Sequence, residues 1–124
     1  MFEAYSLNVE VPATSAIPFK NVTLDKCNDI NLSGDSTIHL NRCGVYEVCV
    51  DSSATAASTL QLYKNGVAQP QAQSTGTTPG FKTYVQVPTN NSNCPCSSPV
   101  TIQVMNPTDA AETLTNVNIT VRRL

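Results

Sequence analysis

The sequence predicts an all-β domain of antiparallel strands, arranged as a sandwich or barrel. The 124 residues are rich in Thr, Val, Asn and Ser and include eight Pro and five Gly, a balance of β-branched residues and turn formers. Short alternating segments recur between polar turns, and no segment is long enough for a crossover helix, which excludes parallel α/β folds. We expect one domain over residues 1–124, with residues 1–4 as a possible flexible N-terminus.

The first strand is expected over Tyr5 to Val11, where apolar residues alternate with polar ones. Its odd-numbered residues, from Tyr5 to Val11, form the face that we expect to be buried. Pro12 and Pro18 follow, and because proline cannot donate to a β-ladder we expect this segment to lie on an edge or to make a bend. Further short strands are expected at 22–24, 30–32 and 37–40.

The clearest strand is Val45 to Val50, which follows a glycine at position 44 that tolerates unusual backbone angles. Glu47 and Cys49 point to the face opposite the core residues. Across the chain, the residues expected in the core are Tyr46, Val48, Val50, Leu62, Ile102 and Ile119.

The second half of the chain predicts four further strands. After a small-residue linker over 51–58, a strand at 59–63 runs into a tight turn at Asn65-Gly66, which is the strongest short hairpin signal. The polar segment 68–80 is expected to be an exposed loop. Strands are expected at 81–87, 100–105 and 117–124, with a single helical turn over 108–113.

Composition and charge exclude several classes of function. Seven Lys+Arg against nine Asp+Glu give a net charge of -2, so we expect no nucleic-acid partner. No apolar stretch reaches the roughly 18 residues that a spanning helix needs, so we expect no membrane partner. The first residues from Met1 lack the basic and apolar regions of a signal peptide, and we expect the protein to be made without one.

The sequence also lacks the residue patterns that are typical of an enzyme active site. His39 is the single histidine, it lies in a short strand, and we expect an ordinary outward-facing residue. The acidic residues are scattered, and no phosphate-binding or nucleophile motif occurs. We expect no catalytic residues and no cofactor.

Five cysteines are the unusual feature. Cys27, Cys43, Cys94 and Cys96 are candidates for disulfides, with connectivity left open, and Cys49 is a candidate for the odd thiol. Cys94 and Cys96 are weak candidates for a metal site, because their spacing is not that of a zinc knuckle.

Several segments, taken in order, resemble a known superfamily. They are Ile17-Pro18-Phe19, Ser36 to Leu40, Gly44 to Val48, the hairpin Leu60 to Val67, and the final strand Asn116 to Leu124. This order resembles the complement C1q and tumour-necrosis-factor-like jelly roll, in the bacterial and phage branch that includes C-terminal domains of spore-surface collagen-like proteins. Cys43 departs from that branch, which often has Pro before the glycine.

The resemblance implies a jelly roll of about eight to ten strands that forms a homotrimer and is not an enzyme. It places the first and last strands near the threefold axis, with Tyr5, Arg122, Arg123 and Leu124 as candidate axis residues. Glu3, Glu10 or a terminal carboxylate would then balance the arginines.

Three roles remain open for such a trimeric display domain. The first is a component of a phage virion surface, as capsid decoration, head-fibre tip or receptor-binding head, because no Gly-x-y stalk precedes Tyr5. The second is a structural or trimerisation domain on a spore or cell surface. The third is a carbohydrate-binding module that uses the polar segments 69–80 and 90–98, which the absence of Trp argues against.

Overall fold

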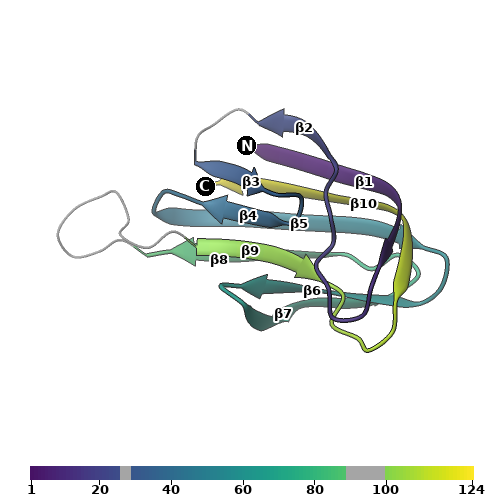
Figure 1. Cartoon of the computed structure of the whole chain (residues 1–124). Coiled ribbons are helices and arrows are strands. Elements are labelled where there is room, and N and C mark those ends of the chain that lie inside the picture. Colours follow the sequence, from purple (N-terminus) through teal and green to yellow (C-terminus); the bar gives the residue numbers. More distant parts are fainter. Residues whose placement is uncertain (26–28, 89–99) are drawn as a thin grey trace.

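The computed structural model is an antiparallel β-sandwich, and it describes residues 1–25, 29–88 and 100–124 (Figure 1). The strands are β1 (Phe2–Val11), β2 (Asn21–Asp25), β3 (Ile30–Ser33), β4 (Thr37–Leu40), β5 (Gly44–Ala54), β6 (Ser58–Lys64), β7 (Val67–Gly76), β8 (Phe81–Val87), β9 (Val100–Met105) and β10 (Glu112–Arg123). Sheet A has the order β2-β1-β10-β5-β8 and sheet B the order β3-β4-β9-β6-β7. The predicted all-β sandwich is confirmed.

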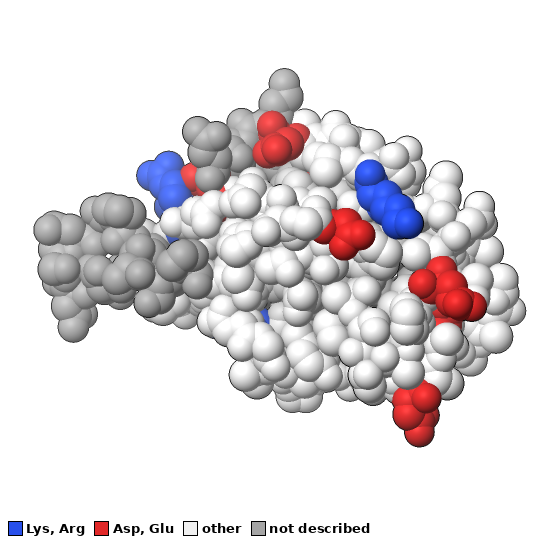
Figure 2. All heavy atoms as spheres, in the orientation of Figure 1, with Lys and Arg blue, Asp and Glu red and all other residues white. Residues whose placement is uncertain are grey.

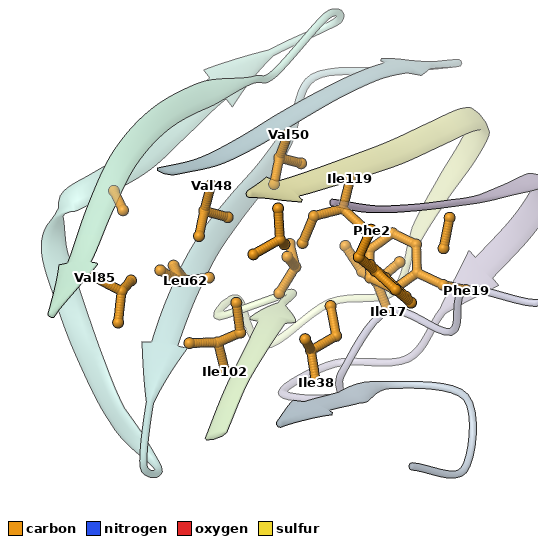
Figure 3. Packing of buried hydrophobic residues seen from close by; sticks show 14 of the residues in the cluster. Phe2, Ile17, Phe19, Ile38, Val48, Val50, Leu62, Val85, Ile102 and Ile119 are labelled. Carbon is orange, nitrogen blue, oxygen red and sulfur yellow. The ribbon is translucent and has the colours of Figure 1, made fainter. Parts of the chain in front are cut away.

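The two sheets enclose one apolar core, in which side chains from both inner faces meet (Figure 3). Tyr46, Val48, Val50, Leu62, Ile102 and Ile119, the six residues expected in the core, are all fully buried. The buried Tyr46 keeps its hydroxyl paired, because it donates to the Arg42 carbonyl at 2.7 Å. The alternation along β5, β9 and β10 therefore identified the inner faces correctly.

The first strand corrects our expectation about which face is buried. Its inward residues are Phe2, Ala4 and Ser6, and only beyond Asn8 do they become Val9 and Val11. Asn8 has a φ of 51°, a left-handed conformation that asparagine tolerates, and this irregularity shifts the alternation by one residue. The odd-numbered residues before Asn8 therefore face solvent.

The N-terminus is also more ordered than expected. Strand β1 begins at Phe2, which pairs with Val121 of β10 and Asp25 of β2 and is only 1% exposed. A flexible N-terminus over residues 1–4 is therefore wrong, because Phe2 and Ala4 fill the core between two paired neighbours.

Two other segments differ from the predictions. Residues 67–76 form the edge strand β7, not a loop, because the Asn65-Gly66 turn (φ 51° and 80°) returns the chain antiparallel to β6. Residues 108–113 form no helical turn, and β10 already begins at Glu112. Strand β5 continues to Ala54, through part of the segment expected to be a linker.

Asn106 connects the β9–β10 loop to the end of β1. Its Nδ2 donates to the carbonyls of Val11, Pro12 and Ala110 at 3.2–3.3 Å and 2.8 Å, while its Oδ1 accepts from Thr108. Asn106 is fully buried, so this side chain satisfies backbone groups that water cannot reach.

Candidate self-association surface

The outward face of sheet A carries most of the exposed large apolar side chains. Leu7 on β1 is 57% exposed, Val45 on β5 is 38% exposed and Tyr84 on β8 is 54% exposed. The C-terminal Leu124, 61% exposed, lies beside Val45, because its N–H donates to the Val45 carbonyl at 2.8 Å. We call these four residues the sheet A apolar set. Exposed apolar groups gathered on one face are typical of an interaction surface.

A cluster of charged side chains lies beside Val45, Tyr84 and Leu124, whereas Leu7 lies toward the other end of the sheet. The Arg122 Nε is 3.1 Å from Glu47 Oε1, and the Lys82 Nζ is 3.6 Å from Glu47 Oε2. The hydrogen bond from Arg122, together with the positive charges of Arg122 and Lys82, lowers the pKa of Glu47 although burial acts to raise it. Because Glu47 is paired in register with Tyr84, the ionised cluster adjoins the apolar set.

Cys49 lies in the same face, between Thr120 of β10 and Lys82 of β8 in the strand register. Burial, together with the negative charge of Asp51, raises the pKa of its thiol. Cys49 is half-buried and free, and the raised pKa keeps it in the protonated, less reactive form at neutral pH. Its role as the odd thiol stays a prediction, because Cys27, Cys94 and Cys96 lie outside the described residues.

The outward face of sheet B has a different character. Its five strands contain a single Lys, Arg, Asp or Glu residue, Lys64, whose Nζ reaches the Gln86 carbonyl at 3.2 Å. Neutral polar side chains form hydrogen bonds on this face; for example, Gln103 Nε2 donates to Thr37 Oγ1 at 3.0 Å. Figure 2 shows almost no charge over β6 and β7. Its strongly exposed apolar residue is Val67, 62% exposed, at the hairpin tip.

The candidate axis residues lie on neighbouring strands of sheet A, with Tyr5 some way along β10 from the three C-terminal ones. Tyr5 is half-buried on β1 and pairs with Asn118 of β10, while Arg122, Arg123 and Leu124 are exposed at the end of β10. The last strand is no edge, however, because β10 lies between β1 and β5. Strand β10 therefore has no free edge that a threefold axis would need to cover.

Within one chain the arginines have partners other than the expected counter-charges, whose role across a trimer axis stays a prediction. Arg122 pairs with Glu47 of its own chain, not with Glu3 or Glu10. The Arg123 Nε donates to the Cys43 carbonyl at 3.0 Å. Glu3 instead accepts from the Thr23 hydroxyl at 2.7 Å. The sequence hid the Arg122–Glu47 pair because the two residues meet only through the pairing of β10 with β5.

Three of the four cysteines that are disulfide candidates lie outside the described residues. Cys43 is buried before β5, whereas Cys27, Cys94 and Cys96 fall in the segments that the structure does not describe. The disulfide and metal candidates among them stay predictions. Among residues 1–25, 29–88 and 100–124, no three His, Cys, Asp or Glu side chains gather as metal ligands. His39 is half-buried in β4.

No helix long and apolar enough to span a membrane is present in the described part of the chain. Of the polar segments weighed for sugar binding, 69–76 belongs to strand β7, and 90–98 lies outside the described residues.

Strand order and register define the class of protein: a ten-stranded antiparallel jelly-roll sandwich of two five-stranded sheets. Comparison with solved structures narrows this class. The globular domain of zebrafish complement 1qA matches with a TM-score of 0.71 at 10% identity, over 99% of this chain and 95% of that one. Murine APRIL matches with a TM-score of 0.63 at 9% identity, over 99% and 98%.

Rabbit GITRL matches with a TM-score of 0.59 at 14% identity, over 100% of this chain and 94% of that one. No family model and no curated protein matches the sequence. The chain therefore has the C1q/TNF-like jelly-roll fold, as the resemblance of its sequence segments predicted, and the low identities establish the fold alone.

The residues that sequence analysis missed are Leu7, Val45 and Tyr84. Val45 and Tyr84 each break the polar side of an otherwise alternating strand, and an apolar residue at such an outward position is the signal that could have identified them. Leu7 gave no such signal, because it continues the apolar alternation from Tyr5 to Val11 and faces outward only through the shift at Asn8.

Proposed function

We propose that this protein is a non-enzymatic structural domain that assembles as a homotrimer through the outward face of sheet A. The observation that carries the proposal is that Val45, Tyr84 and Leu124 lie on this face around the Glu47 ion-pair cluster, with Leu7 exposed toward the other end of the same face. Two further copies of the chain are the occupants, because the C1q/TNF-like fold implies a homotrimer.

The chemistry of the face supports this assignment. Burying the sheet A apolar set is favourable by about 25 cal/mol per Å² of apolar surface removed from water. The charges of Arg122 and Lys82 are already paired with Glu47 within one chain, which lowers the cost of covering them. Sheet B offers neither feature.

The size of the particle in solution tests the proposal directly. Light scattering coupled to size exclusion, run with and without reductant, is expected to give three times the chain mass of 13.2 kDa in both conditions. A monomer contradicts the trimer, and a trimer that reductant dissolves shows that disulfides, not this face, hold the copies together.

Matched variants show which face is used. Tyr84→Glu places a charge in the sheet A apolar set and is expected to yield monomers, whereas Val67→Glu, at a similarly exposed position in sheet B, is expected to leave the trimer intact. Circular dichroism spectra of both variants are the control that each one folds. Monomers from Val67→Glu with intact trimers from Tyr84→Glu would place the interface on sheet B.

We further propose that the trimer is a display component of a phage virion surface, with a spore or cell surface as the alternative. The support is the order of sequence segments that resembles the bacterial and phage branch of the superfamily. Antibody raised against the purified protein, used in immunogold electron microscopy of phage particles and of spores and cells from the same culture, tests the choice. Label on capsids or tails supports the proposal, and label confined to spores or cells supports the alternative.

A further inference from the structure

The carboxyl group of Glu112 links the two sheets at one end of the sandwich. Glu112 is the first residue of β10 in sheet A, where it pairs with Val11 of β1, and it is only 7% exposed. Its Oε1 accepts a hydrogen bond from the backbone N–H of Thr59, in β6 of sheet B, at 2.6 Å. One side chain therefore joins a strand of each sheet.

The second oxygen of this carboxyl group has no comparable partner. Glu112 Oε2 is buried and accepts no hydrogen bond from the described residues. An ionised carboxylate with a bare buried oxygen is costly, since that oxygen has lost its water without a replacement donor. Protonation removes the buried charge, which is the larger part of this cost, and Oε1 still accepts from Thr59.

Among the described residues, the elements next to Glu112 place no cation where it would offset the charge. Of the ionisable residues on the neighbouring elements, Glu10 on β1, Asp51 on β5 and Asp109 in the β9–β10 loop are acidic and exposed. Lys64 is the cation of β6, and its Nζ is held at the far end of that strand by the Gln86 carbonyl. Burial raises the pKa of Glu112, and the Thr59 hydrogen bond opposes this rise.

We propose that Glu112 is a pH-sensitive latch between the two sheets: its carboxyl group joins β10 to β6, and loss of its proton destabilises the folded sandwich, because a buried charge is then left with a single hydrogen bond. The proposal does not depend on the trimer, because the latch lies within one chain.

The direction of the effect of pH on stability follows from the raised pKa of Glu112. A carboxyl group whose pKa is higher in the folded than in the unfolded chain binds its proton more tightly in the folded state. Its contribution to stability is complete below the ordinary value of 4.5 and is lost as the pH rises through the folded-state pKa. The latch thus favours the folded domain in acid, opposite to Glu47.

Glu112→Gln tests the latch, because the amide keeps an acceptor for Thr59 and mimics the protonated acid. Thermal melting of the full chain between pH 4 and pH 8, at fixed protein concentration, is expected to show the variant above wild type at pH 8, with the difference closing toward pH 4. Glu10→Gln, a matched change of an exposed carboxylate one strand away, is expected to follow wild type. A pH profile of Glu112→Gln parallel to that of wild type overturns the proposal.

A second readout uses the wild-type protein and does not require the variant to fold. The amide proton of Thr59 is expected to shift in NMR spectra with an apparent pKa above 4.5, because it donates to the titrating group. A Thr59 amide that titrates at or below 4.5, or not at all, overturns the latch even where the trimer is confirmed. A monomeric protein whose Thr59 amide titrates as expected leaves the latch standing and removes the trimer.

Discussion

Both sheets contribute side chains to the core, but they present different chemistry to their surroundings. Sheet A carries exposed apolar side chains and the paired charges of Arg122, Glu47 and Lys82, whereas sheet B presents neutral Thr, Gln and Asn side chains. Inner faces are constrained in the same way by packing, so they cannot distinguish the sheets. The outer faces show where a second molecule would gain free energy by binding.

The largest expected effects lie on the inner faces and should be similar in both sheets. Tyr46→Ala in sheet A and Ile102→Ala in sheet B each remove a fully buried side chain, at a cost of about 3–5 and about 2–5 kcal/mol respectively. Denaturant unfolding followed by circular dichroism measures both. A cost near zero for either variant would show that the strand concerned is not packed in the register described here.

An intermediate effect is expected at Asn106, which joins the end of β1 to the β9–β10 loop. Asn106→Ala leaves the carbonyls of Val11 and Pro12 without their donor and should cost about 1–3 kcal/mol in the same assay. Asn31→Ala is the control on the outer side of sheet B, where the exposed side chain accepts a hydrogen bond from Asn41 Nδ2 at 2.6 Å, and it is expected to change stability by less than about 0.5 kcal/mol. Equal costs would remove the distinction between a buried and a surface amide.

The smallest expected effect on stability is that of Glu47, on the outer face of sheet A. The pKa of Glu47 is lowered by Arg122 and Lys82, so its contribution to stability is present above the ordinary value of 4.5 and is lost as the pH falls through the lowered value. Glu47→Gln should therefore flatten the acid side of the melting profile between pH 3 and pH 6. Added salt should reduce the difference from wild type, because this ion pair is exposed, and a difference insensitive to both salt and pH contradicts the assignment.

Much of the fold could be read from local pattern. The strands at Thr37–Leu40, Phe81–Val87 and Val100–Met105 have the predicted bounds, because each alternates strictly and is bordered by turn residues. Strand β7 was missed because it is an edge strand with one buried residue, Ala72, and its pairing depends on the preceding turn and not on its own pattern. The part of strand β1 before Asn8 was assigned to the wrong face because the alternation changes at that residue, whereas Val9 and Val11 are buried as predicted.

The candidate surface was predicted only in part. Tyr5, Arg122, Arg123 and Leu124 were named as axis residues through the family resemblance, and sheet A does bring their strands together. Val45, Tyr84 and the Glu47 pairs were not predicted, since residues on β5, β8 and β10 become neighbours only when strands distant in the sequence pair. Glu112 read as one of many solvated acids until β6 was seen to lie against it.

The sequence by itself determined the all-β class, the positions of most strands and the side chains that fill the core, because alternation and turn chemistry are local properties of the chain. Only the tertiary structure decided the strand order, which outer face is apolar, and which charges meet. Those features arise from contacts between residues up to the length of the chain apart, such as Phe2 with Val121, and no local pattern specifies them.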